Sequence, residues 1–220
     1  MVMAMPKVYL SPSDQTKNTY AYGNTNEAVQ CGIIAEACKT ALERCGFDVK
    51  IGHMISMAQK CAESDVFGAA LHVPIHSNAF NGSVSGTRIF CYDMSGNGYK
   101  ACKAIYNVLA PFTPGKSDSI SAQPQLYEIR VPAAPTAYIE VDFHDNSTAA
   151  KWIVEHTTEI GEKIAQGICN YFGIAYKAPQ AEEGKLYRVQ VGAYKVRANA
   201  EAMLAKLKAA GFDGFIKEET

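Results

Sequence analysis

The alternation of short apolar runs with helical patterns is the feature that most constrains how this chain folds. Residues 7–10, 47–51 and 69–75 have the composition of buried strands, and a long pattern of apolar residues at helical spacing occupies residues 26–46. Strands that alternate with helices in this way are typical of α/β proteins. The sequence therefore predicts an α/β fold with an open, mostly parallel sheet flanked by helices.

The same alternation continues toward the middle of the chain. We expect further strands at residues 86–92, 126–130 and 137–143, and further helices at residues 56–63, 98–109, 148–156 and 159–172. A loop rich in Ser, Pro and Gln precedes the strand at residues 126–130. Because proline lacks the backbone donor that a central strand uses, Pro74 predicts a bulge or a sheet edge beside His76.

A polar segment, KAPQAEEGK at residues 177–185, has the composition of a linker. After it, residues 187–192 alternate as a strand, residues 198–210 form a helical pattern, and residues 212–217 predict a last strand. We therefore divide the chain into a main domain (1–176), a linker (177–185) and a small C-terminal βαβ unit (186–220). A unit of this size cannot bury a core by itself, so we expect it to pair with something.

Composition argues against several classes of function. Lys and Arg number 21 against 22 Asp and Glu, so the charge does not favour a nucleic-acid partner. No run of 18 apolar residues predicts a membrane span, and the segment MVMAMPKVYL lacks the pattern of a signal peptide. The seven scattered cysteines suit buried core positions better than disulfides or metal ligands, which favours synthesis in a reducing cytoplasm.

Four polar residues fall where an open α/β sheet binds its ligands, around the carboxyl ends of strands. Asp14 follows the first strand and Glu27 opens the first helix. His76 ends the third strand, and Glu140 lies in the strand at residues 137–143. Imidazole and carboxylate groups can hold Zn²⁺ with a position open for water, although a histidine at a strand end is more often an ordinary hydrogen-bonded residue. Glu140 is stronger evidence for a functional site than this histidine. Its apolar neighbours predict a buried carboxylate, and an unpaired buried carboxylate is costly.

Two segments around these residues resemble the zinc-dependent N-acetylmuramoyl-L-alanine amidases of bacterial cell-wall hydrolases and phage endolysins. Residues 73–79, VPIHSNA, are similar to the family's S-[IL]-H-x-N-A metal motif, and residues 134–143, APTAYIEVDF, to its P-A-[VI]-L-[VI]-E-x-G-F segment. The resemblance implies Zn²⁺ as the cofactor, His76 and Glu27 as metal ligands and Glu140 as the general base. It also implies hydrolysis of the peptidoglycan amide that joins the lactyl group of N-acetylmuramic acid to L-Ala of the stem peptide.

The third metal ligand stays open at this point. Where the family carries Asp-Pro-Gly-His, this chain has SPSD at residues 11–14, which places Asp14 at the position of a histidine ligand. We favour Asp14. His144, four residues after Glu140, is the second candidate, and a site of two protein ligands or one completed by water is the third alternative. The departure supports one rival hypothesis, a non-catalytic peptidoglycan-binding protein with a degenerate metal site. A second rival is a zinc peptidase that cleaves the stem peptide itself, because it would need the same water, metal and base.

The C-terminal segment resembles the first half of a sporulation-related repeat (SPOR) domain, which implies binding to peptidoglycan glycan strands. One half alone leaves strand edges uncovered, so we expect either a homodimer that completes the sheet or packing on the main domain. These features together predict a cell-wall hydrolase that is made in the cytoplasm without a signal peptide and acts on the wall after release. No nucleic-acid or membrane partner is expected.

Overall fold

The computed structural model describes residues 5–180 and 189–218. The chain divides into two compact units, Met1–Pro179 and Gln180–Thr220, which are described separately below. No helix within the described residues is both long enough and apolar enough for a bilayer crossing.

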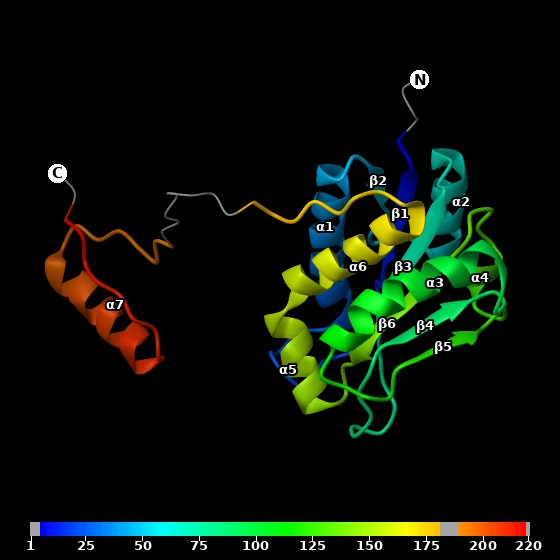
Figure 1. Cartoon of the computed structure of the whole chain (residues 1–220). Helices are drawn as coiled ribbons and strands as arrows, with labels where there is room; N and C mark the ends of the chain where they lie inside the picture. The colour runs from blue at the N-terminus through cyan, green and yellow to red at the C-terminus, as the bar shows by residue number, and fades with distance from the viewer. Residues whose placement is uncertain (1–4, 181–188, 219–220) are drawn as a thin grey trace. The chain divides into compact units, whose positions relative to one another are not determined.

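A six-stranded sheet organises the first unit (Figure 1). Its strands are β1 (Lys7–Pro12), β2 (Asp48–Ile51), β3 (Leu71–Asn78), β4 (Arg88–Cys91), β5 (Ser119–Ala122) and β6 (Tyr138–Phe143). They follow the order β2-β1-β3-β6-β4-β5, and every neighbouring pair is parallel except β4 with β6. The predicted open, mostly parallel sheet is confirmed.

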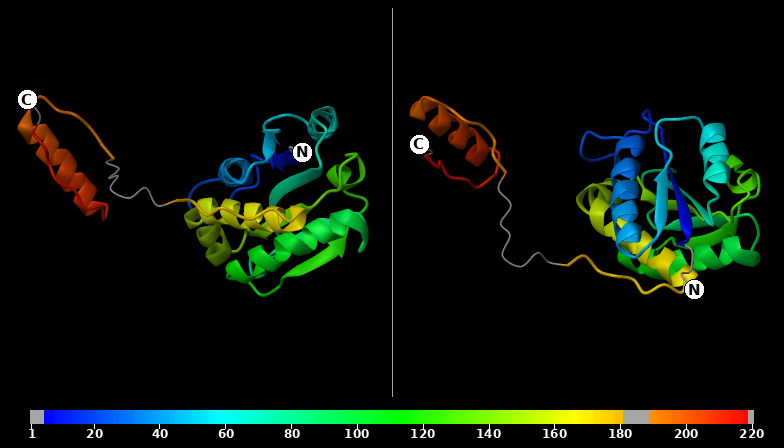
Figure 2. Two further views of the ribbon diagram at one scale, coloured as in Figure 1. Left: turned by 45° about the horizontal axis from the view of Figure 1, so that its top comes forward. Right: turned by 90° about the horizontal axis from the view of Figure 1, so that it is seen from above.

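Helices cover both faces of this sheet. The helices are α1 (Glu27–Arg44), α2 (Met57–Phe67), α3 (Gly96–Leu109), α4 (Tyr127–Arg130), α5 (Ser147–Glu155) and α6 (Thr157–Phe172), with a short 3-10 turn at Ala110–Phe112. The apolar core joins residues of α1, α3, α5 and α6 to alternate residues of the strands, whereas it contains no residue of α2 or α4. In Figures 1 and 2, α3 and α6 lie side by side on this core face.

Local sequence signals explain where several helices begin and how they pack. The Asn26 side chain accepts a hydrogen bond from the backbone of Val29 and caps α1, and Ser56 with Gln59 forms a capping box at α2. α6 approaches α1 closely at Gly161, where an added Cβ would lie 2.6 Å from the Cβ of Ala37. Only a residue without a side chain permits this approach.

Two expectations for the first unit were wrong, and one is confirmed. Residues 127–130 form the helical turn α4 instead of a strand, because this turn buries the adjacent residues Glu128 and Ile129 together. β5 lies in the segment expected to be a loop, because an edge strand with the polar sequence SISA carries little apolar signal. The bulge expected beside His76 is present as a register shift between His76 and Asn78.

Among the described residues of the second unit, Arg197–Ala209 form the helix α7, close to the predicted range. Residues 189–192 and 212–217 form no strand, so the expected βαβ pattern is wrong for these described residues, while residues 187 and 188 of the first expected strand lie outside them. A strand requires a hydrogen-bonded neighbour, and none pairs with either segment within residues 189–218. Apolar side chains of both segments are exposed, among them Val189 at 92% and Phe215 at 78%.

Candidate active site

The candidate site is built on the two neighbouring strands β3 and β6. His76 and Glu140 are register partners across this parallel pair. Ile75 and Ile139, one residue earlier on each strand, belong to the apolar core. Because side chains alternate between the faces of a sheet, His76 and Glu140 both project from the opposite face.

Glu27, the first residue of α1, is buried and pairs with His76. Its Oε1 lies 2.9 Å from His76 Nδ1, and Asn18 Nδ2 donates a hydrogen bond of 2.6 Å to Oε2. Burial opposes ionisation of Glu27, but the hydrogen bonds from His76 and Asn18 outweigh it and lower the pKa of this carboxyl. Burial likewise opposes the charge on His76, yet the hydrogen bond to Glu27 raises the pKa of the imidazole. The two groups therefore stabilise each other in their charged forms.

Glu140 is placed differently, because it has a free carboxylate oxygen. Its Oε2 is buried with no hydrogen-bond partner in the described part of the chain. Burial raises the pKa of Glu140 to about 7, with the charge of His76 acting in the opposite direction and that of Glu27 adding to the rise. A carboxyl group with a pKa near neutrality can both take up and return a proton, as a general base requires.

The donors at this site fit a divalent metal ion. A carboxylate oxygen of Glu27 and a ring nitrogen of His76 lie within 2.9 Å of each other, and both are common ligands of Zn²⁺. Tyr138 stacks on the His76 ring with centroids 4.7 Å apart, which fixes the orientation of the imidazole. His76 Nε2 is buried and has no hydrogen-bond partner within the described residues.

Asp14, one candidate for the third ligand, is engaged elsewhere. Its Oδ2 lies 2.7 Å from Nζ of the buried Lys60, and its Oδ1 accepts a hydrogen bond of 2.7 Å from the backbone of Met54. The adjacent residue Gln15 instead faces the pair, with Nε2 at 3.5 Å from His76 Nδ1. Sequence reasoning missed Gln15, although its place directly after the first turn was a signal that could have found it.

His144, the other candidate, contacts Ser77, the residue that follows His76. Its Nδ1 is 2.9 Å from the carbonyl oxygen of Ser77 and 3.0 Å from Ser77 Oγ. Its ring stacks on Tyr20, with centroids 5.3 Å apart. The structure thus brings together Glu27, His76 and Glu140, and it gives both Asp14 and His144 other partners.

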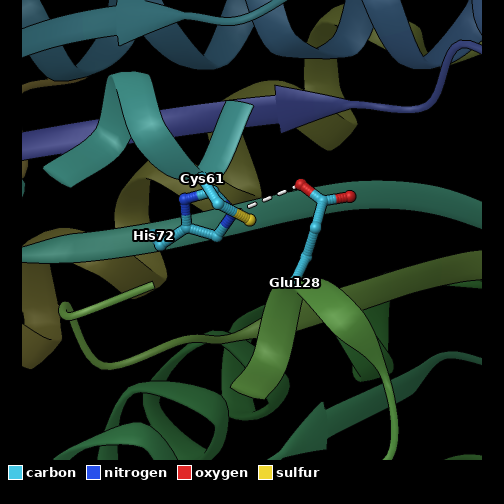
Figure 3. A group of neighbouring side chains, drawn as sticks. All are labelled: Cys61, His72 and Glu128. Atoms are coloured by element: carbon cyan, nitrogen blue, oxygen red, sulfur yellow. Dashed lines mark hydrogen bonds and ion pairs between the residues drawn. The ribbon is translucent and has the colours of Figure 1, made fainter. Parts of the chain in front are cut away.

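A second group of ligand-type side chains consists of Cys61, His72 and Glu128 (Figure 3). One donor atom of each residue lies within 4.8 Å of the others, and all three residues are buried. All seven cysteines are free and buried, as the sequence predicted. The proximity of Cys61 to an imidazole and a carboxylate was not predicted, because the three residues come from separate elements.

A carboxyl group with a buried, unpartnered oxygen beside a carboxylate and imidazole pair, on an open α/β sheet, is an arrangement that suits a hydrolase. A sequence profile of the N-acetylmuramoyl-L-alanine amidase family matches residues 10–170, and a SPOR domain profile matches residues 170–218. The first match covers most of the chain, so this protein belongs to the N-acetylmuramoyl-L-alanine amidase family. It is accordingly a peptidoglycan hydrolase of the amidase type.

Similar proteins agree with this assignment. The sporulation-specific N-acetylmuramoyl-L-alanine amidase of Bacillus subtilis is 24% identical over 219 residues, which cover 96% of this chain and 84% of that protein. The amidase CwlM of Bacillus licheniformis is 25% identical over 162 residues, 74% of this chain and 62% of that protein. The solved catalytic domain of the amidase CwlV from Paenibacillus polymyxa shares the fold, with a TM-score of 0.70 at 16% identity, over 78% of this chain and 100% of that chain.

Proposed function

We propose that this chain cleaves the amide between N-acetylmuramic acid and L-Ala with Glu140 as the general base and with Glu27 and His76 as ligands of Zn²⁺. Bound Zn²⁺ would supply Lewis-acid polarisation of the scissile carbonyl. The observation that carries the proposal is Glu140, which has a buried, unpartnered carboxylate oxygen and a pKa of about 7 beside the carboxylate and imidazole pair.

The side chains around the pair support this division of roles. Asn18 and His76 keep Glu27 ionised, as a ligand must be. Glu140 takes a proton from the attacking water and returns it to the departing amine of L-Ala. We infer that Gln15, near His76 Nδ1, helps to complete the donor set, whereas Asp14 fixes the loop after β1 through Lys60.

Activity and products test this proposal together. The full chain, stripped with a chelator and reloaded with Zn²⁺, is added to a peptidoglycan suspension, and the loss of turbidity and the new amino termini are measured. We expect the wild type to release L-Ala termini with intact sugars, and Glu140→Gln to bind Zn²⁺ without lysis. Glu155→Gln, which changes an exposed carboxylate on α5, is the matched control and should keep its activity.

The rival hypotheses give different results in the same assay. A wild type that binds the wall but neither lyses it nor binds Zn²⁺ would indicate a binding protein with a degenerate site. New termini other than L-Ala would indicate a peptidase. Lysis by Glu140→Gln at the wild-type rate would refute the assigned base.

The C-terminal unit adds binding to peptidoglycan, and we propose that it also pairs two chains. The exposed apolar residues Val189, Phe212 and Phe215 support pairing, because a second copy would bury them. Sedimentation of the full chain should give a dimer, and Phe212→Ser with Phe215→Ser should give a monomer. A wild-type monomer at the highest concentration that can be measured would refute pairing.

We further propose that the enzyme reaches the wall after release from the cytoplasm. Seven free cysteines, all buried, suit folding in a reducing compartment. Fractionation of intact producing cells should find the protein in the cytosol until the cells lyse. Its recovery outside intact cells would contradict this route.

A further inference from the structure

We propose that Cys61, His72 and Glu128 bind a second divalent ion of the Zn²⁺ type, separate from the ion at Glu27 and His76. The three side chains come from α2, β3 and α4 and converge at one place on the sheet face opposite the apolar core (Figure 3). Their residues are 1%, 0% and 2% exposed. This inference does not depend on the mechanism proposed for Glu140.

The donor set matches the ion. A thiolate sulfur, an imidazole nitrogen and a carboxylate oxygen are all ligands that Zn²⁺ takes in tetrahedral sites. With His72 neutral, the negative charges of Cys61 and Glu128 balance the two positive charges of the ion. A buried site that is neutral overall avoids the cost of an uncompensated charge.

The separations of the donor atoms suit such a site. His72 Nε2 lies 3.3 Å from Glu128 Oε1. Two ligands on one tetrahedral Zn²⁺, each bonded at about 2.0 to 2.2 Å, are about 3.3 to 3.6 Å apart. Binding would thus replace a long hydrogen bond by two coordination bonds with little movement of either side chain.

Neighbouring residues hold the ligands in place. Ser11 Oγ donates a hydrogen bond to Glu128 Oε1, and Tyr9 stacks on the His72 ring with centroids 5.4 Å apart. Contacts of this kind orient the ligands in metal sites. In the absence of an ion, His72 Nε2–H faces the Glu128 carboxylate, so binding through Nε2 moves this proton to Nδ1, which has no partner within the described residues.

Uptake of the ion has a defined proton balance. Burial, together with the charge of Glu128, raises the pKa of the Cys61 thiol to about 12, so the thiol is protonated in the ion-free protein. Binding replaces this proton by the sulfur–metal bond, and one proton leaves to the solvent. No electron is transferred in this step.

The position of the triad indicates what the ion would do. α2 and α4 contribute nothing to the apolar core, and polar contacts hold them, such as the hydrogen bond from Tyr9 to Glu63 and the ion pair of Lys60 with Asp14. An ion bound by Cys61, His72 and Glu128 would link both helices to β3. His72 and His76 are four residues apart on this strand, about 13 Å, so the two ions would share no ligand.

Cobalt provides a probe that reports the sulfur ligand. The full chain carrying Glu27→Gln and His76→Ala, which removes the donors of the active site, is stripped with a chelator and loaded with Co²⁺. We expect a near-ultraviolet charge-transfer band from thiolate to Co²⁺ and binding of about one ion per chain. Adding Cys61→Ala should abolish the band, whereas adding Cys38→Ala, which removes a buried cysteine of the apolar core, should leave it unchanged.

X-ray absorption of the Zn²⁺-loaded Glu27→Gln, His76→Ala variant shows whether sulfur is a ligand of the ion, even if Cys61→Ala fails to fold. A sulfur neighbour at about 2.3 Å from the ion supports the site. A first shell of nitrogen and oxygen alone, or a cobalt band that survives Cys61→Ala, would overturn it. Peptidoglycan lysis is not part of this test, so failure of the mechanism proposed for Glu140 would leave its outcome unchanged.

Discussion

Replacement of Glu140, the proposed base, by glutamine should remove activity and also stabilise the chelated protein at alkaline pH. The pKa of Glu140 is about 7 in the folded protein, against an ordinary value of 4.5, mainly because burial disfavours the charged form. The folded state therefore holds this proton at pH values where the unfolded chain has released it. As the pH rises from about 4.5 to about 7, the free energy of unfolding falls.

The size of this effect follows from the two pKa values. At 1.36 kcal/mol per pKa unit, ionisation of Glu140 costs about 3 kcal/mol of stability above pH 7 and about 1 kcal/mol at pH 5. Glutamine has nearly the same shape and never ionises. The stability of Glu140→Gln relative to that of the wild type should thus increase by about 2 kcal/mol when the pH rises from 5 to 8.

Urea unfolding of the chelated proteins at pH 5 and pH 8 measures this difference directly. Glu155→Gln on α5 serves as the control, because its exposed carboxylate should leave the pH dependence unchanged. If Glu140→Gln and the wild type differ by the same amount at both pH values, the argument from burial is refuted.

Three further substitutions test the remaining assignments. His76→Ala should abolish lysis and remove the Zn²⁺ bound with Glu27; retained lysis in the turbidity assay would exclude this ligand. Asp14→Ala should leave the buried ammonium of Lys60 without its carboxylate. In urea unfolding the stability should fall by about 2 kcal/mol, less than for a fully buried ion pair because Asp14 is partly exposed. The affinity of this variant for Zn²⁺, measured by titration, should not change. A lower affinity with unaltered stability would indicate that Asp14 is a ligand. Gly161→Ala should force α6 away from Ala37 of α1 and cost about 2 kcal/mol, seen as a lower melting temperature.

Local patterns in the sequence determined most of the sheet and part of the active site. Apolar runs and helix caps act over a few residues, so β1, β3 and β6 and the start of α1 were predictable. The positions of His76 in β3 and Glu140 in β6 were predictable for the same reason, because each lies in a strand with a recognisable local motif. Their side-by-side placement then follows from the parallel pairing of β3 with β6.

The tertiary structure decided which polar side chains meet. Asp14 forms an ion pair with Lys60, which is distant in the sequence, and no local pattern indicates that the carboxylate has this partner. In the helical turn of α4, Glu128 contacts Ser11 and His72 of distant segments, although the short sequence of the turn alternates like a strand. Periodicity shows that a residue is buried, but the identity of its neighbours depends on how distant segments pack. For that reason the meeting of Cys61 with His72 and Glu128 became visible only in the folded chain.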